Sequence, residues 1–437
     1  MKKNIITFIL LFVLLFNVVF ITDAFAVSQP TISAPSGILI DFQTGDVLYE
    51  KNGNTPMYPA STTKIMTALL TLENCTLDEV VTIDDKSPFT GGSRIYLNEG
   101  EKVTVEQLLY ALLVKSANDA AVALAIHISE NVDSFANLMN KRAKELGAKN
   151  TNFTNPNGLP DPNHITTAYD LALIAKKAME IPKFREIVKT SRYEIPPTNE
   201  QEETRYLKNS NRLLWGTGGR NKMEYKGELI DIKYDIVDGI KTGYTVAAQQ
   251  CLVATAQKDG HRVISVVLKA TGKNIYSDTR TLLDYAFEGF KTIKLTIGNK
   301  KVKSIYVNND KSLNINLLTK NTLYKTVPKD GSYNIQKKVE ITDGIKLPIE
   351  KGQILGQIIY TNNDSEFAKV DLISDRSLEE KKLFPTFTIG KSILIGLSSL
   401  ILLFLIYRTI VTMRRIKRRK IKKRRLGKYK QVNKYKK

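Results

Sequence analysis

Three short motifs in a fixed order constrain this chain more than any other feature of its sequence. Ser61-Thr62-Thr63-Lys64 comes first and opens an apolar run. Ser116-Ala117-Asn118 lies between two further apolar runs, and Lys241-Thr242-Gly243 lies in a strand-like stretch. A Ser-x-x-Lys motif alone arises by chance in a Lys-rich chain, and a polar helix cap explains it equally well. The three motifs together, in this order, instead predict a single active site.

The first motif predicts a nucleophile and its base. Pro59 precedes a Ser/Thr cluster and then apolar residues at helical spacing, which indicates a helix N-terminus with Ser61 in its first turn. Residues three apart lie on one face of a helix. The Lys64 amine is therefore expected within reach of the Ser61 hydroxyl, as activation of a serine requires.

The pattern of the rest of the region up to residue 290 predicts an α+β fold. Two short runs around a glycine-containing turn, 37–41 and 46–50, predict a hairpin just before the Ser61 helix. Further helices are expected over 105–114, 117–128, 135–146, 169–175 and 277–290, and strands over 238–244, 251–256 and 263–268. Ser116 is expected to cap the helix that follows it. Segments from both ends of the region then form one antiparallel sheet with flanking helices.

Residues 31–290 resemble the serine-type D-alanyl-D-alanine carboxypeptidases among the low-molecular-mass penicillin-binding proteins. The likeness covers the three motifs, Asp41, Pro59-Ala60-Ser61, Asn118-Asp119-Ala120 and the run Val237–Thr245. It implies a β-lactamase/transpeptidase-like fold and removal of the terminal D-alanine from peptidoglycan stem peptides. It also implies β-lactam antibiotics as covalent inhibitors and no cofactor.

The resemblance also implies a role for each motif residue. Ser61 is expected to be the acylated nucleophile, Lys64 its base and Ser116 a proton relay to the leaving amine. Asn118 is expected to bind a substrate amide, Lys241 and Thr242 the terminal carboxylate, and Gly243 to keep that strand open.

Physical arguments agree with these roles. Lys64 must be neutral to accept a proton, and burial beside a second cation such as Lys241 lowers the pKa of a lysine. The Ser61 backbone N–H at a helix N-terminus, with a second N–H near Tyr244, would form an oxyanion hole. The charge of Lys241 matches a free carboxylate, which favours exopeptidase over endopeptidase action.

Two other functions on the same scaffold stay open, namely a β-lactamase or esterase and a non-catalytic penicillin-sensing module. The segment 151–167 has no glutamate that could deacylate the enzyme as in class A β-lactamases. Only three histidines are present, which argues against a Ser-His-Asp triad and against a His-based metal site. Cys75 and Cys251 could form a disulfide or remain as two thiols.

Composition changes along the chain predict its domain organisation. We expect a signal peptide over 1–26, a catalytic domain over 27–290, a small all-β domain over 291–375, a linker over 376–387, a transmembrane helix over 388–413 and a basic cytoplasmic tail over 414–437. The apolar run 392–407 covers about 24 Å as a helix. An interfacial helix is the alternative, but the run has no polar face.

The tail from Arg414 to Lys437 holds 15 of the chain's Lys and Arg residues and no Asp or Glu, and so supplies 15 of the net charge of +21. Basic residues beside a membrane segment are typical of a cytoplasmic end in contact with anionic lipids. The sequence therefore predicts a cell-membrane protein with a single C-terminal span, an extracytoplasmic catalytic domain and no nucleic-acid partner.

Overall fold

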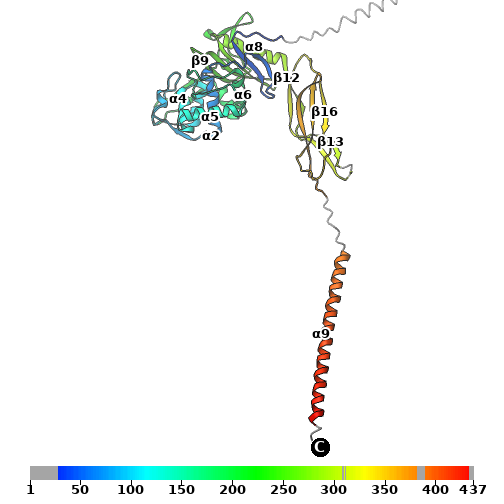
Figure 1. Ribbon diagram of the computed structural model, residues 1–437. Coiled ribbons are helices and arrows are strands. Elements are labelled where there is room, and N and C mark those ends of the chain that lie inside the picture. The colour runs from blue at the N-terminus through cyan, green and yellow to red at the C-terminus, as the bar shows by residue number, and fades with distance from the viewer. Residues whose placement is uncertain (1–27, 308–309, 311, 381–388, 433–437) are drawn as a thin grey trace, which may run out of the picture. The chain divides into compact units, whose positions relative to one another are not determined.

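In the computed structural model, which describes residues 28–307, 310, 312–380 and 389–432, a five-stranded antiparallel sheet forms the centre of the region 36–270 (Figure 1). Its strand order is β2-β1-β11-β10-β9. The strands are β1 (Ser36–Asp41), β2 (Val47–Lys51), β9 (Val237–Thr245), β10 (Gln249–Lys258) and β11 (His261–Ala270). The expected hairpin of β1 and β2 is thus confirmed. Strands from both ends of the α+β region also share one sheet, as expected, because β1 pairs with β11.

The two faces of this sheet bury different helices because successive side chains of a strand point to opposite faces. On one face, Ile38 and Ile40 pack in a cluster with residues of α2 to α7. On the other face, Leu39 packs with residues of α8. The helices are α2 (Lys64–Asn74), α3 (Val105–Tyr110), α4 (Asn118–Ser129), α5 (Val132–Glu145), α6 (Ala168–Glu180), α7 (Pro182–Lys189) and α8 (Asn274–Gly289). The expected α+β architecture is confirmed.

Short elements connect these helices and strands. Three two-stranded antiparallel sheets pair β3 (Val80–Thr82) with β4 (Lys102–Thr104), β5 (Arg192–Ile195) with β6 (Arg205–Lys208), and β7 (Lys222–Tyr225) with β8 (Glu228–Asp231). The single-turn helices are η1 (Ala60–Thr63), η2 (Ser87–Phe89), η4 (Arg212–Leu214) and η5 (Gly219–Asn221), and η3 (Ala111–Lys115) is a π-helix.

The helix expected over 105–114 differs from the prediction at its end. It is an α-helix only to Tyr110 and continues as the π-helix η3. Ser116 then adopts a left-handed conformation (φ 66°) that ends this helix. The expectation that Ser116 caps the next helix is wrong, because Ala117 is the N-cap of α4 and no side chain bonds the cap. The left-handed residue instead turns the chain between two buried helices.

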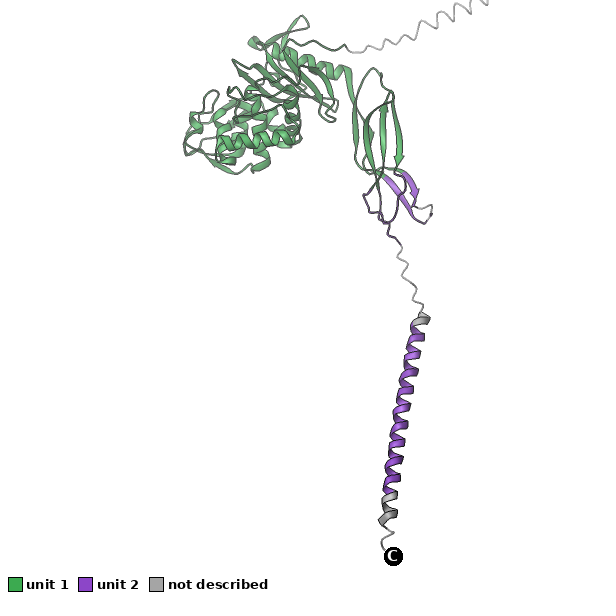
Figure 2. Cartoon of the chain, viewed as in Figure 1, with its two compact units in different colours: residues 1–302, 318–341, 354–373 green, residues 303–317, 342–353, 374–437 purple. Residues whose placement is uncertain are grey.

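Residues 290–374 are all-β, as expected. The strands are β12 (Phe290–Thr296), β13 (Lys301–Tyr306), β14 (Asn314–Thr319), β15 (Leu323–Pro328), β16 (Ile335–Ile341), β17 (Ile354–Asn362) and β18 (Ser365–Ser374). Strand β12 pairs with β15, and β17 pairs with β16 and β18. The chain divides into two compact units, residues 1–302, 318–341 and 354–373 in one and residues 303–317, 342–353 and 374–437 in the other (Figure 2).

A single long helix, α9 (Ile389–Val432), forms the C-terminal part of the described chain (Figure 1). Its segment Ser392–Arg425 is long and apolar enough to cross a membrane. The large apolar side chains from Ile393 to Tyr407 are exposed. The expected signal peptide 1–26, most of the linker and the end of the basic tail lie outside the described residues.

Candidate active site

A cavity of about 480 Å³ lies where η1, the turn at Ser116 and strand β9 meet. Three of the predicted motif segments contribute to its wall. The lining residues are Ser61, Ser93, Ser116, Ser210, Arg212, Thr242, Gly243, Tyr244, Gln250, Gly272, Lys273 and Tyr276. The fold therefore brings together residues that are far apart in the sequence.

Ser61 lies in the single-turn helix η1, directly before α2, and Lys64 is the first residue of α2. The Lys64 Nζ lies 3.1 Å from the Ser61 Oγ, within hydrogen-bond distance. The predicted three-residue spacing thus places the two groups in contact, although the first turn is a 3₁₀-helix. Lys64 is fully buried and Ser61 half-buried, so the serine faces the cavity and the lysine lies behind it.

The other two partners of Lys64 determine how its amine can act. Its Nζ donates to the Asn118 Oδ1 at 2.6 Å and to the backbone oxygen of Asn157 at 2.7 Å. A neutral amine has two N–H groups and one lone pair. When both N–H groups are used in this way, the lone pair is left for the Ser61 hydroxyl proton.

The environment favours this neutral form. Burial lowers the pKa of Lys64 well below its usual value, the charge of Lys241 lowers it further, and Asp119 acts in the opposite direction. Burial also lowers the pKa of Lys241 to about 7. Two buried lysines near one another cannot both hold a proton at little cost. The expected coupling between Lys64 and Lys241 is therefore present.

Ser116 and Asn118 take different positions at the site. Ser116 lines the cavity with Ser61. Asn118 is buried, and its amide bridges Lys64 and the backbone oxygen of Gly91, to which its Nδ2 donates at 2.7 Å. Asn118 thus orients the lysine and one cavity wall. Its role as a substrate-amide ligand stays a prediction.

Strand β9 lies against η1 and forms another part of the cavity wall. A Cβ on Gly243 would lie 2.9 Å from the Ser61 backbone nitrogen, so only glycine leaves that N–H accessible. Thr242 faces the cavity, and its hydroxyl is 2.7 Å from the Ser210 hydroxyl. Lys241 is buried, and its Nζ donates to the Thr242 backbone oxygen at 2.9 Å.

His164 supports the turn that carries Ser61. Its Nδ1 accepts from the Thr154 backbone N–H at 3.0 Å, so its Nε2 carries the proton and donates to the Thr63 hydroxyl at 2.8 Å. Thr63 in turn donates to the Ala60 oxygen. Burial, with a contribution from Lys64, lowers the pKa of His164 to about 4, so the ring is neutral. His164 therefore has a structural role.

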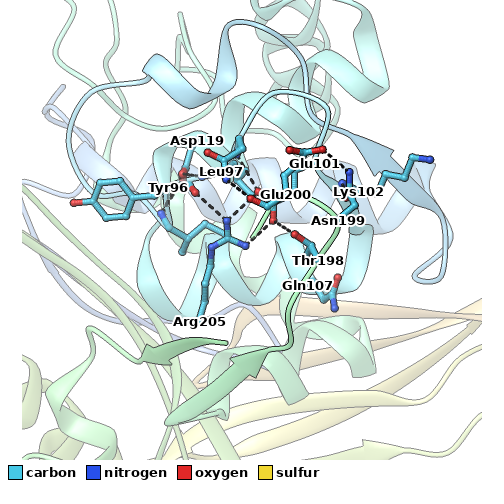
Figure 3. A network of polar contacts seen from close by, with 12 residues as sticks. Tyr96, Leu97, Glu101, Lys102, Gln107, Asp119, Thr198, Asn199, Glu200 and Arg205 are labelled. Atoms are coloured by element: carbon cyan, nitrogen blue, oxygen red, sulfur yellow. Dashed lines mark hydrogen bonds and ion pairs between the residues drawn. The ribbon is translucent and has the colours of Figure 1, made fainter. Parts of the chain in front are cut away.

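The segment 91–101 forms another part of the cavity wall through Ser93 and is held by buried charges in its middle and at its C-terminal end (Figure 3). In the middle, the Asp119 carboxylate accepts hydrogen bonds from the N–H groups of Ile95 and Leu97 at 3.1–3.2 Å. At the C-terminal end, Arg205 forms a buried ion pair with Glu101, with N–O distances of 2.6 and 2.9 Å. The wall next to Asn118 is thus rigidly held.

Several cavity residues were missed by the sequence analysis. These are Ser93, Ser210, Arg212, Gln250, Gly272, Lys273 and Tyr276. Two of them, Arg212 and Lys273, place positive charge on the wall, whereas Lys241 is buried and is not one of the residues that line the cavity. All of the missed residues lie outside the three motifs. Arg212 begins η4, Gln250 lies in β10 and Tyr276 in α8, while the others lie in loops or turns, so no shared sequence pattern marks them. Cys75 and Cys251 are free thiols.

Comparisons with known proteins agree with this geometry. Residues 23–272 match the family model of D-alanyl-D-alanine carboxypeptidase, and residues 290–380 match the C-terminal domain of penicillin-binding protein 5. The chain is 36% identical over 366 residues to the D-alanyl-D-alanine carboxypeptidase DacF of Bacillus subtilis, covering 82% of this chain and 89% of the relative.

Solved structures show the same relationship. Penicillin-binding protein 5 from Haemophilus influenzae is 30% identical, covers 81% of this chain and 100% of its own, and has a TM-score of 0.68. The DD-transpeptidase of Streptomyces K15 is 35% identical, covers 60% of this chain and 99% of its own, and has a TM-score of 0.53. The 81% of this chain that penicillin-binding protein 5 covers is more than the α+β region alone, so the likeness extends into the all-β region.

Proposed function

Because this chain belongs to the serine-type D-alanyl-D-alanine carboxypeptidases among the low-molecular-mass penicillin-binding proteins, we propose that it removes the terminal D-alanine of peptidoglycan stem peptides through an acyl-enzyme on Ser61. The observation that carries the proposal is the 3.1 Å contact between the Ser61 Oγ and a Lys64 Nζ whose N–H groups already have acceptors.

The proposed reaction has two steps. The Ser61 O–H passes its proton to Lys64 while its Oγ bonds to the carbonyl carbon of the penultimate D-alanine. The C–N bond then breaks, the proton on Lys64 passes through Ser116 to the leaving amine, and an ester on Ser61 remains. Water adds to this ester and releases the shortened peptide, which restores the serine hydroxyl. The Ser61 backbone N–H, left open by Gly243, stabilises the oxyanion.

The site also bears on the two alternative functions, a β-lactamase or esterase and a penicillin-sensing module. The segment 151–167 has no glutamate that could act as a second base for fast deacylation, and its residue Asn157 accepts from Lys64 through its backbone oxygen. A β-lactamase is thus disfavoured. A penicillin-sensing module would be acylated on Ser61 but would not turn over.

Release of D-alanine separates the three functions. The purified full chain should release D-alanine from a peptide ending in D-Ala-D-Ala in many turnovers, while it hydrolyses a β-lactam only slowly. A chromogenic β-lactam is the matched substrate. Fast β-lactam turnover without D-alanine release would indicate a β-lactamase, and acylation by both without turnover would indicate a sensing module.

We further propose that Lys241 pairs with the free carboxylate of the substrate. Amidation of that carboxylate should then lower kcat/KM of the wild type about ten- to a hundredfold, as the loss of one charged contact worth about 1.5–3 kcal/mol predicts. Lys241→Ala should lose activity on the free acid and discriminate less between the two peptides. Because the variant also removes a charge that lowers the Lys64 pKa, rates are compared across pH.

Lys273→Ala is the matched control, since Lys273 is a lysine that lines the cavity itself. If Lys241→Ala keeps the wild-type discrimination at every pH while Lys273→Ala loses it, the carboxylate site lies at Lys273 and the proposal for Lys241 is wrong.

We also propose that α9 anchors the protein in the cell membrane, with the basic residues from Arg414 onward in the cytoplasm next to anionic lipids. External protease on intact cells should then digest the catalytic and all-β regions and leave a tag after Lys437 intact. Detergent, but not high salt, should extract the full chain. Digestion of the tag, or release by salt, would contradict a spanning helix.

A further inference from the structure

A second group of chemically reactive side chains lies away from the cavity, at the far ends of two helices whose first residues build the active site. Cys75 is the C-cap of α2, His127 lies in the last turn of α4, and Glu79 precedes strand β3. Lys64 and Asn118 begin the same two helices. Since α2 has 11 residues, Cys75 lies about 16 Å along the helix from Lys64.

The three side chains converge. The Cys75 Sγ, a Glu79 carboxylate oxygen and a His127 ring nitrogen all lie within 4.8 Å of one another. The His127 Nε2 and the Glu79 Oε1 are 2.8 Å apart. Ligands of a tetrahedral zinc ion with bonds of about 2.0–2.3 Å are themselves roughly 3.5 Å apart. Small rotations of the exposed Glu79 and His127 would therefore complete such a geometry.

The charges at this point favour a divalent cation. A thiolate and a carboxylate together balance two positive charges, and a neutral imidazole adds a third ligand. The C-terminal ends of α2 and α4 carry partial negative charge from their helix dipoles. The donors are one sulfur, one nitrogen and one oxygen, a mixture that suits Zn²⁺, whereas Ca²⁺ and Mg²⁺ prefer oxygen ligands alone.

We propose that Cys75, Glu79 and His127 bind a zinc ion that ties together the C-terminal ends of α2 and α4. The three side chains fill three positions of a tetrahedral site, and water occupies the fourth. Binding displaces the thiol proton of Cys75, so it weakens as the pH falls. The scarcity of histidine in the sequence argues against a site built from several histidines, and this one needs a single histidine.

Thiol reactivity tests the site independently of catalysis. The experiment uses the full-length protein without a polyhistidine tag. Of its two thiols, Cys251 is buried and Cys75 is the accessible one. Saturating ZnCl₂ should slow alkylation of Cys75 at least tenfold, and equal MgCl₂ or CaCl₂ should not. His127→Ala and Glu79→Gln should each weaken this protection at least tenfold, whereas Asp78→Asn, an acidic neighbour outside the group, should keep it.

A cobalt spectrum supplies a second measurement. Co²⁺ should give a thiolate charge-transfer band that Cys75→Ser removes and Cys251→Ser retains. Zinc should raise Tm by about 2–4 °C in the wild type, as ligand binding to the folded state requires, and not in His127→Ala. The proposal would be overturned if zinc did not protect Cys75 from alkylation. It would also be overturned if zinc protected Cys75 equally in the wild type, His127→Ala and Glu79→Gln.

Discussion

Ser61→Ala will abolish covalent labelling by penicillin, and Lys64→Met will reduce the rate of labelling by about two to four orders of magnitude. The first variant removes the atom that is acylated. The second removes a general base, a loss that typically costs a factor of about 10²–10⁴. Labelled penicillin followed by gel fluorography and by peptide mapping of the acylated residue measures both effects. Label retained on Ser61→Ala would show that another nucleophile reacts.

The pH profile of the wild type follows from the same base. Only neutral Lys64 can accept the Ser61 proton, and burial with the charge of Lys241 lowers the Lys64 pKa. The reactive form is therefore present above this lowered pKa, and acylation slows as the pH falls through it. In Lys241→Ala, the pKa of Lys64 should rise, and the acid limb of the profile should move to higher pH.

A matched control separates loss of the base from loss of packing. The Lys64 side chain is fully buried, so a truncation such as Lys64→Ala would remove packing as well as the base. Methionine keeps most of the volume but leaves the Asn157 oxygen without its donor. Thr67 donates to the neighbouring Pro156 oxygen at 2.6 Å and does not touch Ser61. Thr67→Val should therefore lower Tm but keep acylation.

The contact between Ser61 and Lys64 could be predicted because it is local. Helical spacing alone brings residues three apart together, and the 3₁₀ geometry of η1 does not change that result. The central sheet was also predictable, since short continuous apolar runs such as Ile38-Leu39-Ile40 are typical of strands buried on both faces, and these residues pack in two cores. These features depend on patterns within a few residues.

Other features depend on contacts that a local pattern does not contain. The Asn157 oxygen that binds Lys64 is a backbone atom, so no residue type marks it. Arg212 and Lys273 reach the cavity only through the folding of distant turns. Helix α7 was missed because it is short, although Pro182 at its start and the buried Phe184 were available as signals.

The largest stability effect is expected at the ion pair between Glu101 and Arg205 (Figure 3). Both side chains are buried, at 0% and 8% exposure, so removing one partner leaves an uncompensated charge. Such a loss costs about 3–5 kcal/mol. Glu101→Gln should lower the free energy of unfolding by about this amount in urea. Because Ser93 of the same segment lines the cavity, KM for the peptide should also rise.

The pH dependence and a surface control make this expectation specific. Burial raises the pKa of Glu101, but hydrogen bonds from Arg205, the Asn98 N–H and Thr198 outweigh it and hold the pKa below 4.5. A depressed carboxyl pKa adds stability above the unfolded value, and this contribution is lost as the pH falls through the folded pKa. The difference between wild type and Glu101→Gln should therefore be full at pH 7 and shrink below about pH 4.5. Glu145→Gln, which breaks the exposed pair with Arg142, should cost less than about 1 kcal/mol. Equal costs for the two variants would show that burial gives the Glu101 pair no special weight.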